Sequence, residues 1–231
     1  MRCVLFDLDG TLVDTWWLYV EAYRRTLAPH FGRPLTMEDL RVLRPTSEIR
    51  LLHNAVGAEA APAYHRAFIE HYGRLHAERC EGVYPGVPEL LATLRGEERR
   101  LGLVTGKSRP AWEITAAHCA LGPFEAVVTD EDVQRPKPDP AGLQLALAQL
   151  GVAPRDSLYV GDSLDDLGAA HATGMAFAGV LWCKAPGERE AFAAAARERG
   201  ALACLETPQA LLTLLESAEA EVVAPRRAGA C

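Results

Sequence analysis

The sequence of 231 residues has no long apolar run, no basic cluster within its body and no closely paired cysteines. Without a run of about eighteen apolar residues, no transmembrane helix and no membrane partner are expected. The formal net charge is −7, and the short basic pair Arg226 and Arg227 lies near the end. Nucleic acid is therefore not an expected partner, because phosphate contacts need lysines and arginines gathered on one face.

The six cysteines form no Cys-x-x-Cys pair and show no zinc-type spacing, so they are interpreted as reduced thiols. Cys3 lies in an apolar run, where a free cysteine behaves as a small hydrophobic residue. A predicted strand follows Met1 directly, where a secreted protein would carry a charged and then apolar leader. Together these features predict a cytoplasmic protein.

What the sequence does contain is a regular alternation of short apolar segments with amphipathic ones after residue 86. Strands are predicted at 101–104, 126–128, 157–160 and 176–181, and helices at 87–94, 111–120, 141–150 and 164–172. Short apolar strands that alternate with helices are typical of a parallel sheet covered on both faces. The predicted fold class is therefore α/β, with a Rossmann-like parallel sheet flanked by helices.

The span 16–80 has a different character, because helical segments separated by proline or glycine follow one another without a convincing strand. This span is predicted to be an all-helical cap domain inserted after the first strand. Residues 1–15 and 81–220 would form the α/β core domain. Residues 221–231 are predicted to be a flexible C-terminal tail.

Polar residues follow the predicted strands at the points where chemistry is expected in such a sheet. They are Asp7 and Asp9 after the first strand, then Thr105, Gly106, Lys137 and Asp162. Each alone has a bland explanation, since Asp-Gly and Thr-Gly close turns and Gly-Asp-Ser caps helices. Their joint occurrence in this order is harder to explain by turns, and it indicates a site for phosphoryl transfer.

The residue types fit that chemistry. Asp7 and Asp162, from adjacent loops, can hold a hard cation such as Mg²⁺ through oxygen ligands. The Thr105 hydroxyl, the Gly106 amide and the Lys137 ammonium would supply donors for phosphate oxygens. A carboxylate nucleophile would form an aspartyl-phosphate, and a second carboxylate two residues on could protonate the leaving group.

The chain resembles the phosphatase branch of the haloacid dehalogenase superfamily over nearly its whole length, including a helical cap directly after the first motif. Four motifs carry the resemblance: FDLDGTLVDT at 6–15, VTGK at 104–107, RPKPDP at 135–140 and VGDSLDD at 160–166. The resemblance implies that Asp7 is the nucleophile and a metal ligand. It also implies that Asp9 is the general acid and base, with its backbone carbonyl on the metal.

The remaining roles also follow from the resemblance. Thr105, Gly106 and Lys137 would bind the phosphate, with Lys137 also steadying the nucleophile. Asp162 would be the side-chain Mg²⁺ ligand of the last motif. Asp166, one helical turn later, would support the metal-bound waters or Lys137. Since the dehalogenases proper lack a carboxylate at the position of Asp9, a halide-displacing activity is not expected.

Some positions depart from the family pattern or lie in the cap. Cys183 stands where a glycine is common and is expected to lie outside the reaction centre. One of Trp16 and Trp17 is expected to pack in the cap core while the other walls the site. Arg44 lies in a cap loop where relatives place substrate-selecting residues, although a surface arginine is the favoured interpretation.

The resulting prediction is a cytoplasmic, Mg²⁺-dependent phosphatase for a small phosphorylated metabolite, similar to phosphoglycolate phosphatases and either a monomer or a homodimer. A phosphomutase of the β-phosphoglucomutase type, a pyrophosphatase and a nucleotidase remain open on the same core. A non-catalytic binding protein ranks last, because the carboxylates and the lysine that the chemistry needs are all present.

Overall fold

The computed structural model describes residues 1–43, 47–78 and 82–223. Its strands form one six-stranded sheet with every neighbouring pair parallel, in the order β3-β2-β1-β4-β5-β6. The strands are β1 (Cys3–Phe6), β2 (Arg100–Val104), β3 (Ala126–Val128), β4 (Ser157–Gly161), β5 (Ala176–Val180) and β6 (Ala203–Leu205). The predicted parallel sheet is confirmed.

Helices cover both faces of this sheet. They are α5 (Val87–Gly96), α6 (Arg109–Cys119), α7 (Ala141–Leu150), α8 (Leu164–Thr173), α9 (Pro186–Glu198) and α10 (Pro208–Val223), with short 3₁₀ turns η1 (Asp130–Asp132) and η2 (Pro154–Asp156). Side chains alternate between the faces along each strand. Val4 and Phe6 of β1 pack in the cluster that contains α5 and α10, whereas Cys3 and Leu5 pack with α7 and α8.

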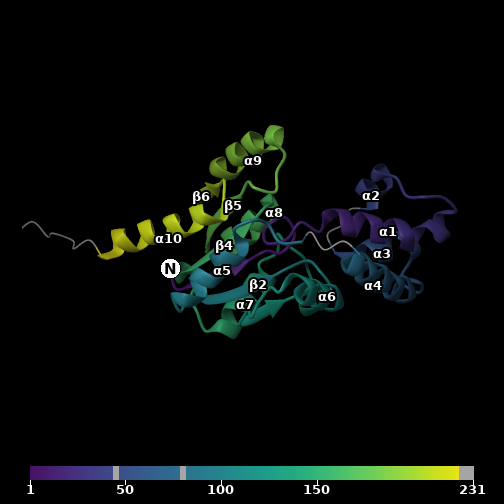
Figure 1. The fold of residues 1–231 in the computed structure, drawn as a ribbon, viewed down its shortest axis with the longest axis horizontal. Coiled ribbons are helices and arrows are strands. Elements are labelled where there is room, and N and C mark those ends of the chain that lie inside the picture. Colours follow the sequence, from purple (N-terminus) through teal and green to yellow (C-terminus); the bar gives the residue numbers. More distant parts are fainter. Residues whose placement is uncertain (44–46, 79–81, 224–231) are drawn as a thin grey trace, which may run out of the picture.

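Four helices between β1 and β2 form the predicted insert. They are α1 (Trp16–Phe31), α2 (Met37–Leu43), α3 (Glu48–Val56) and α4 (Ala61–Glu78). Figure 1 shows them gathered at one end of the molecule, opposite α10. They have a core of their own, which includes Leu27, Leu51, Phe68 and Tyr72. A sheet core with an inserted helical cap is thus confirmed.

The domain boundaries at 15/16 and 80/81 stay a prediction. Helix α10 continues to Val223 and residues 224–231 lie outside the described residues, so the flexible tail at 221–231 also stays a prediction. Arg44 also lies outside the described residues.

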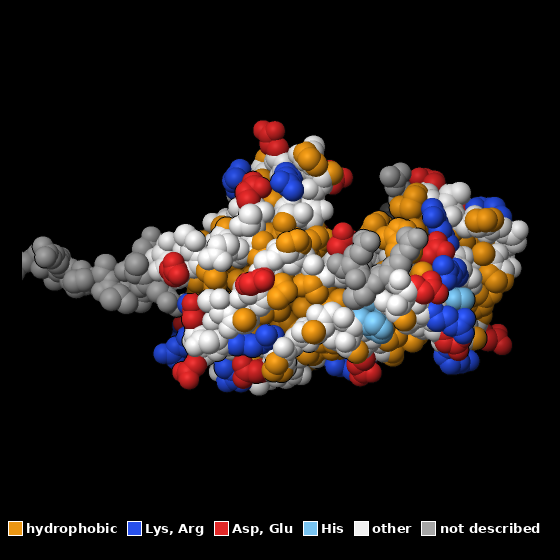
Figure 2. All heavy atoms as spheres, in the orientation of Figure 1, with side chains coloured by type: hydrophobic (Ala, Val, Ile, Leu, Met, Phe, Trp, Pro, Cys, Tyr) orange, Lys and Arg blue, Asp and Glu red, His pale blue; other side chains and the backbone are white. Residues whose placement is uncertain are grey.

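Among the described helices none is both long and apolar enough to cross a membrane. On the face shown in Figure 2, coloured Lys and Arg side chains are interspersed with Asp and Glu.

A buried histidine lies where the insert packs on the core. His76 of α4 is fully buried, and its Nε2 lies 3.3 Å from the Thr115 hydroxyl of α6. The ring packs edge-on against Tyr72, with the centroids 4.7 Å apart. Burial, together with the positive charge of Lys107 and the neighbouring His118, lowers the pKa of His76 to about 4. His76 is therefore neutral in the folded protein at neutral pH.

This histidine is expected to make stability depend on pH. Between about pH 6.5 and pH 4 the unfolded chain binds a proton at His76 that the folded chain does not, so acidification destabilises the fold. The free energy of unfolding should fall by about 1–2 kcal/mol from pH 7 to pH 5 through this residue alone. Urea unfolding of wild type and His76→Gln at both pH values measures it. An equal pH dependence in the two proteins contradicts the assignment.

Candidate active site

The polar residues predicted at the strand ends meet at one edge of the sheet. Asp7 directly follows β1, Thr105 follows β2 and Asp162 follows β4, and these three strands are neighbours. Because parallel strands end at the same edge, the three side chains lie close together. Lys137 reaches the same edge from the loop between η1 and α7.

A cavity of about 310 Å³ opens at this edge. Its walls include the five residues predicted to act on the substrate: Asp7, Asp9, Thr105, Gly106 and Lys137. The helical insert contributes a further set, namely Trp16, Tyr19, Tyr23, Ser47 and Glu48. The cavity thus lies between the core and the insert, and its volume suits a small molecule.

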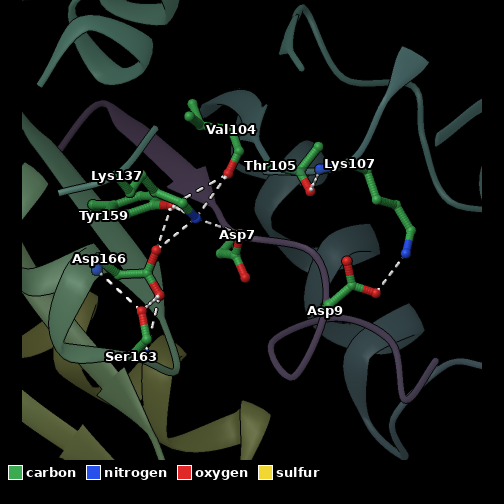
Figure 3. Close-up of polar contacts among 9 residues, drawn as sticks. All are labelled: Asp7, Asp9, Val104, Thr105, Lys107, Lys137, Tyr159, Ser163 and Asp166. Atoms are coloured by element: carbon green, nitrogen blue, oxygen red, sulfur yellow. Dashed lines mark hydrogen bonds and ion pairs between the residues drawn. The ribbon is translucent and has the colours of Figure 1, made fainter. Parts of the chain in front are cut away.

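Lys137 organises the centre of the site (Figure 3). Its ammonium lies 2.6 Å from Asp7 Oδ1, 2.6 Å from Asp166 Oδ1 and 2.9 Å from the Tyr159 hydroxyl. A longer contact of 3.4 Å joins it to the Val104 carbonyl. Figure 3 shows the second carboxylate oxygen of Asp7 pointing away from the ammonium. Asp7 is thereby fixed through one oxygen and presents the other.

Asp166 is held by the start of α8. Its Oδ2 accepts hydrogen bonds from the Ser163 backbone N–H at 3.0 Å and from the Ser163 hydroxyl at 2.7 Å. The hydroxyl in turn accepts from the Asp166 N–H, which completes a capping box. A side chain at Gly161 would come within 2.7 Å of Asp166 Cβ. The sequence Gly-Asp-Ser-x-x-Asp therefore both begins the helix and aims Asp166 at Lys137.

The buried charges shift one another's pKa values. Burial raises the pKa of Asp7 to about 8, and the carboxylates Asp166 and Asp162 add to the increase while Lys137 opposes it. Burial also raises the pKa of Asp162, again with Asp166 adding to it. For Lys137 burial acts downward, but Asp166 and Asp7 outweigh it and raise its pKa well above the usual value. Lys137 is therefore charged in the folded protein.

Three carboxylates at this centre can hold a metal ion. Asp7, Asp162 and Asp166 each offer an oxygen within 4.8 Å of the others. Two ammonium groups contact them, Lys137 and Lys184, the latter 3.0 Å from Asp162 Oδ2. The cluster therefore has three carboxyl groups but only two ammonium groups. A hard divalent cation such as Mg²⁺ fits this oxygen-only donor set.

Gly10 allows the first motif to approach this cluster. Its φ of +77° lies in the left-handed region, and a Cβ there would come within 2.7 Å of Asp162 Cγ. Both the turn and the close approach therefore need glycine.

Asp9 faces the cavity beside the cluster and has partners of its own. The Lys107 ammonium lies 2.7 Å from Asp9 Oδ1, and the Thr15 hydroxyl donates to the same oxygen. Thr105 and Gly106 line the same cavity, and the Thr105 hydroxyl accepts a hydrogen bond from the Lys107 N–H at 3.1 Å. Asp162 and Asp166 are not among the described residues of the cavity wall, and they contact the site from the β4–α8 side.

The insert is tied to the core by Glu48. Its side chain is fully buried and accepts hydrogen bonds from the Tyr19 hydroxyl of α1 and from the Ser108 hydroxyl of the core. His65 Nε2 lies 3.4 Å away. This network fixes α1 and α3 over the cavity.

Several site residues differ from the sequence prediction. Cys183 Sγ lies 3.7 Å from Asp162 Oδ2, so the expectation that it lies outside the centre was wrong. Trp16 lines the cavity as expected, but Trp16 and Trp17 are 55% and 46% exposed, so neither packs in the cap core.

The sequence did not predict four residues that the structure places in or beside the site, namely Lys107, Lys184, Tyr159 and Glu48. Of these, only Lys107 belongs to one of the four motifs, since it closes VTGK.

The chain is similar to several known proteins in sequence and in fold. Residues 4–180 match the family described as haloacid dehalogenase-like hydrolase. The chain is 36% identical to pyrophosphatase PpaX of Bacillus velezensis over 186 residues, which cover 79% of the chain and 84% of that protein. It is 33% identical to phosphoglycolate phosphatase 1 of Pseudomonas aeruginosa over 192 residues, covering 78% and 70%. The phosphate complex of CbbY from Rhodobacter sphaeroides superposes with a TM-score of 0.76 at 26% identity, covering 90% and 95%.

Proposed function

The chain belongs to the haloacid dehalogenase-like hydrolases, and from this premise we propose that it is a Mg²⁺-dependent phosphatase for small phosphate monoesters. The observation that carries the proposal is the contact of 2.6 Å between Lys137 and Asp7 on the wall of a small cavity. An oriented carboxylate beside a lysine and a hydroxyl suits attack on phosphorus.

The proposed reaction has two steps. First, a carboxylate oxygen of Asp7 attacks the phosphorus atom, the bond to the leaving-group oxygen breaks, and Asp9 donates a proton to that oxygen. Second, water attacks the phosphorus of the aspartyl-phosphate while Asp9 accepts a proton from the water. Inorganic phosphate leaves, and both carboxyl groups return to their starting states.

The other residues stabilise charge. Thr105, the Gly106 amide and Lys137 are proposed to donate to phosphate oxygens, where negative charge must be stabilised. Asp7, Asp162 and the backbone carbonyl of Asp9 are proposed to hold Mg²⁺, with Asp166 in support through Lys137. When bound, the ion supplies positive charge that draws the phosphate toward the carboxylates.

Phosphoglycolate is the proposed model substrate, since a relative with 33% identity is a phosphoglycolate phosphatase and the cavity is small. A second candidate is inorganic pyrophosphate, because PpaX of Bacillus velezensis, at 36% identity, is a pyrophosphatase. Both substrates present a phosphoryl group to the same core residues and differ in the leaving group. The insert residues over the cavity, such as Trp16 and Tyr23, would distinguish them.

The test is phosphate release from phosphoglycolate, glycerol 3-phosphate, glucose 6-phosphate, AMP and pyrophosphate, with and without Mg²⁺. At least one phosphate monoester should be hydrolysed with Mg²⁺, and excess EDTA should abolish turnover until Mg²⁺ is restored in excess. Asp162→Asn should raise the Mg²⁺ concentration needed for half-maximal rate by about tenfold or more. Full activity in EDTA contradicts the metal dependence. Hydrolysis of pyrophosphate alone would favour the second candidate.

A further inference from the structure

Lys107 is a buried charged residue that has no role in the reaction described above. Its side chain is fully buried, whereas that of its partner Asp9 is 36% exposed. Burying an ammonium group is unfavourable unless a partner compensates for the lost water. The compensation comes from Asp9 Oδ1 at 2.7 Å and from the Tyr19 ring, whose centroid lies 3.8 Å from the ammonium. The site therefore keeps a desolvated cation next to the proposed proton-transfer group.

The contacts of Asp9 are distributed unequally between its two oxygens. Both described donors, Lys107 Nζ and the Thr15 hydroxyl, contact Oδ1. In Figure 3 the dashed line from Lys107 ends on one oxygen of Asp9, and the other oxygen is drawn on the side of the carboxyl group nearer to Thr105. Two donors on one oxygen fix the rotation of the carboxyl group about its bond to Cβ, so the same oxygen always faces away from them.

The cage around Lys107 comes from the insert, although Lys107 itself belongs to the core. Tyr19 lies on α1 and Tyr72 on α4, and the Tyr72 ring centroid lies 5.1 Å from the ammonium. The ammonium can be sheltered in this way only while the insert packs on the core. The orientation of Asp9 is thereby tied to the placement of the insert over the cavity.

We propose that Lys107 is a positioning residue for Asp9. It holds Oδ1 so that Oδ2 faces the leaving-group oxygen, and Tyr19 and Tyr72 of the insert hold Lys107 in turn. The inference rests on the proposed phosphatase function, in which Asp9 donates a proton to the leaving group. It adds a residue that governs the proton transfers of Asp9 and leaves the attack by Asp7 unaffected.

The consequence is a selective kinetic defect. Proton donation matters for an alcohol leaving group, whereas p-nitrophenolate leaves readily without a proton. Lys107→Met keeps an unbranched apolar side chain between the two rings but removes the ammonium. It should lower kcat/KM by about 100-fold for an alkyl phosphate, within the range of one general acid, and by less than about threefold for p-nitrophenyl phosphate. The constant kcat/KM is the right measure because it covers the steps up to departure of the leaving group and not the later hydrolysis of the aspartyl-phosphate, which both substrates share. A residue that mattered only for folding would lower both rates equally.

The experiment measures kcat/KM for p-nitrophenyl phosphate and for the fastest alkyl phosphate of the substrate panel, in saturating Mg²⁺. The variants are Lys107→Met, Lys107→Arg, Tyr72→Leu and, as the packing control, Thr115→Val. Thr115 bonds the Tyr72 hydroxyl at 2.9 Å, and its other described hydrogen-bond partners are His76 and the Ala111 carbonyl. Lys107→Arg restores the charge and should recover part of the alkyl-phosphate rate. Thr115→Val should keep the wild-type ratio of the two rates.

The outcomes separate this proposal from the function on which it rests. Equal losses for both substrates in Lys107→Met, or a loss of ratio in Thr115→Val as large as in Lys107→Met, overturn the positioning role. If Lys107→Met does not fold, Tyr72→Leu provides the test. Loss of the Tyr72 ring should also lower the alkyl-phosphate rate relative to the p-nitrophenyl phosphate rate, and an unchanged ratio of the two rates would overturn the positioning role. Wild-type activity in Asp7→Asn, or no hydrolysis of any phosphate ester by the wild type, overturns the phosphatase function itself.

Discussion

Replacing Asp7 by asparagine is expected to lower turnover of phosphate monoesters by about 10⁴-fold or more, because the nucleophile is lost. The fold should persist, since the amide oxygen of asparagine can still accept the hydrogen bond that Lys137 donates to Asp7. Burial raises the pKa of Asp7 to about 8, so the carboxylate charge does not stabilise the metal-free fold. The melting temperature of the variant should therefore equal or exceed that of wild type without Mg²⁺.

The matched control is Asp14→Asn, which removes an exposed carboxylate from the same motif and should leave activity unchanged. Initial rates on p-nitrophenyl phosphate and thermal unfolding of both variants give the comparison. Residual activity above about 1% of wild type in a carefully purified Asp7→Asn sample would argue against nucleophilic attack by this residue.

Replacing Lys137 by methionine is expected to reduce both activity and stability. The change leaves Asp7 and Asp166 buried without their shared cation, and breaking such a contact costs about 3–5 kcal/mol in unfolding free energy. Turnover should fall by about 10³-fold, because a charged donor to the phosphate oxygens is lost. Urea unfolding and steady-state rates measure the two effects.

Two further variants make the Lys137 prediction sharper. Arg135→Met removes a cation that is 79% exposed from the same loop. Because water solvates this charge, the loss of its contact with Asp139 should change stability by less than about 1 kcal/mol. Adding Asp166→Asn to Lys137→Met removes one of the two unpaired carboxylates and should restore part of the lost stability. A loss below about 1 kcal/mol in Lys137→Met would contradict the role of Lys137 as the centre of the charge cluster.

The strand-end prediction worked because parallel strands share one edge. Three separate parts of the sequence line one cavity, and they contribute Asp7 with Asp9, Thr105 with Gly106, and Lys137. Short apolar strands and their helices were also readable, since burial on both faces leaves few polar residues in them. These features depend on local pattern and on topology, both of which the sequence carries.

Contacts between residues that are distant in the sequence could not be predicted from the sequence in the same way. Glu48 looks like an ordinary residue of an amphipathic helix, and its burial depends on how α3 packs against Ser108. Lys184 reaches Asp162 from the loop after β5, and a loop conformation has no periodic pattern to reveal it. Cys183 was misplaced for the same reason. The contacts of the predicted site residues therefore required the fold, whereas the convergence of these residues on one edge of the sheet did not.

If the phosphoryl group passes through Asp7, it can be trapped there as an acyl phosphate. Wild-type enzyme mixed with substrate and Mg²⁺ is quenched in acid within one turnover, reduced with borohydride and digested for mass spectrometry. Asp7 should be converted to homoserine, as reduction of an acyl phosphate requires, and Asp7→Asn should give no such product. Reduction at Asp9 or at another carboxylate, with Asp7 unmodified, would contradict passage through Asp7.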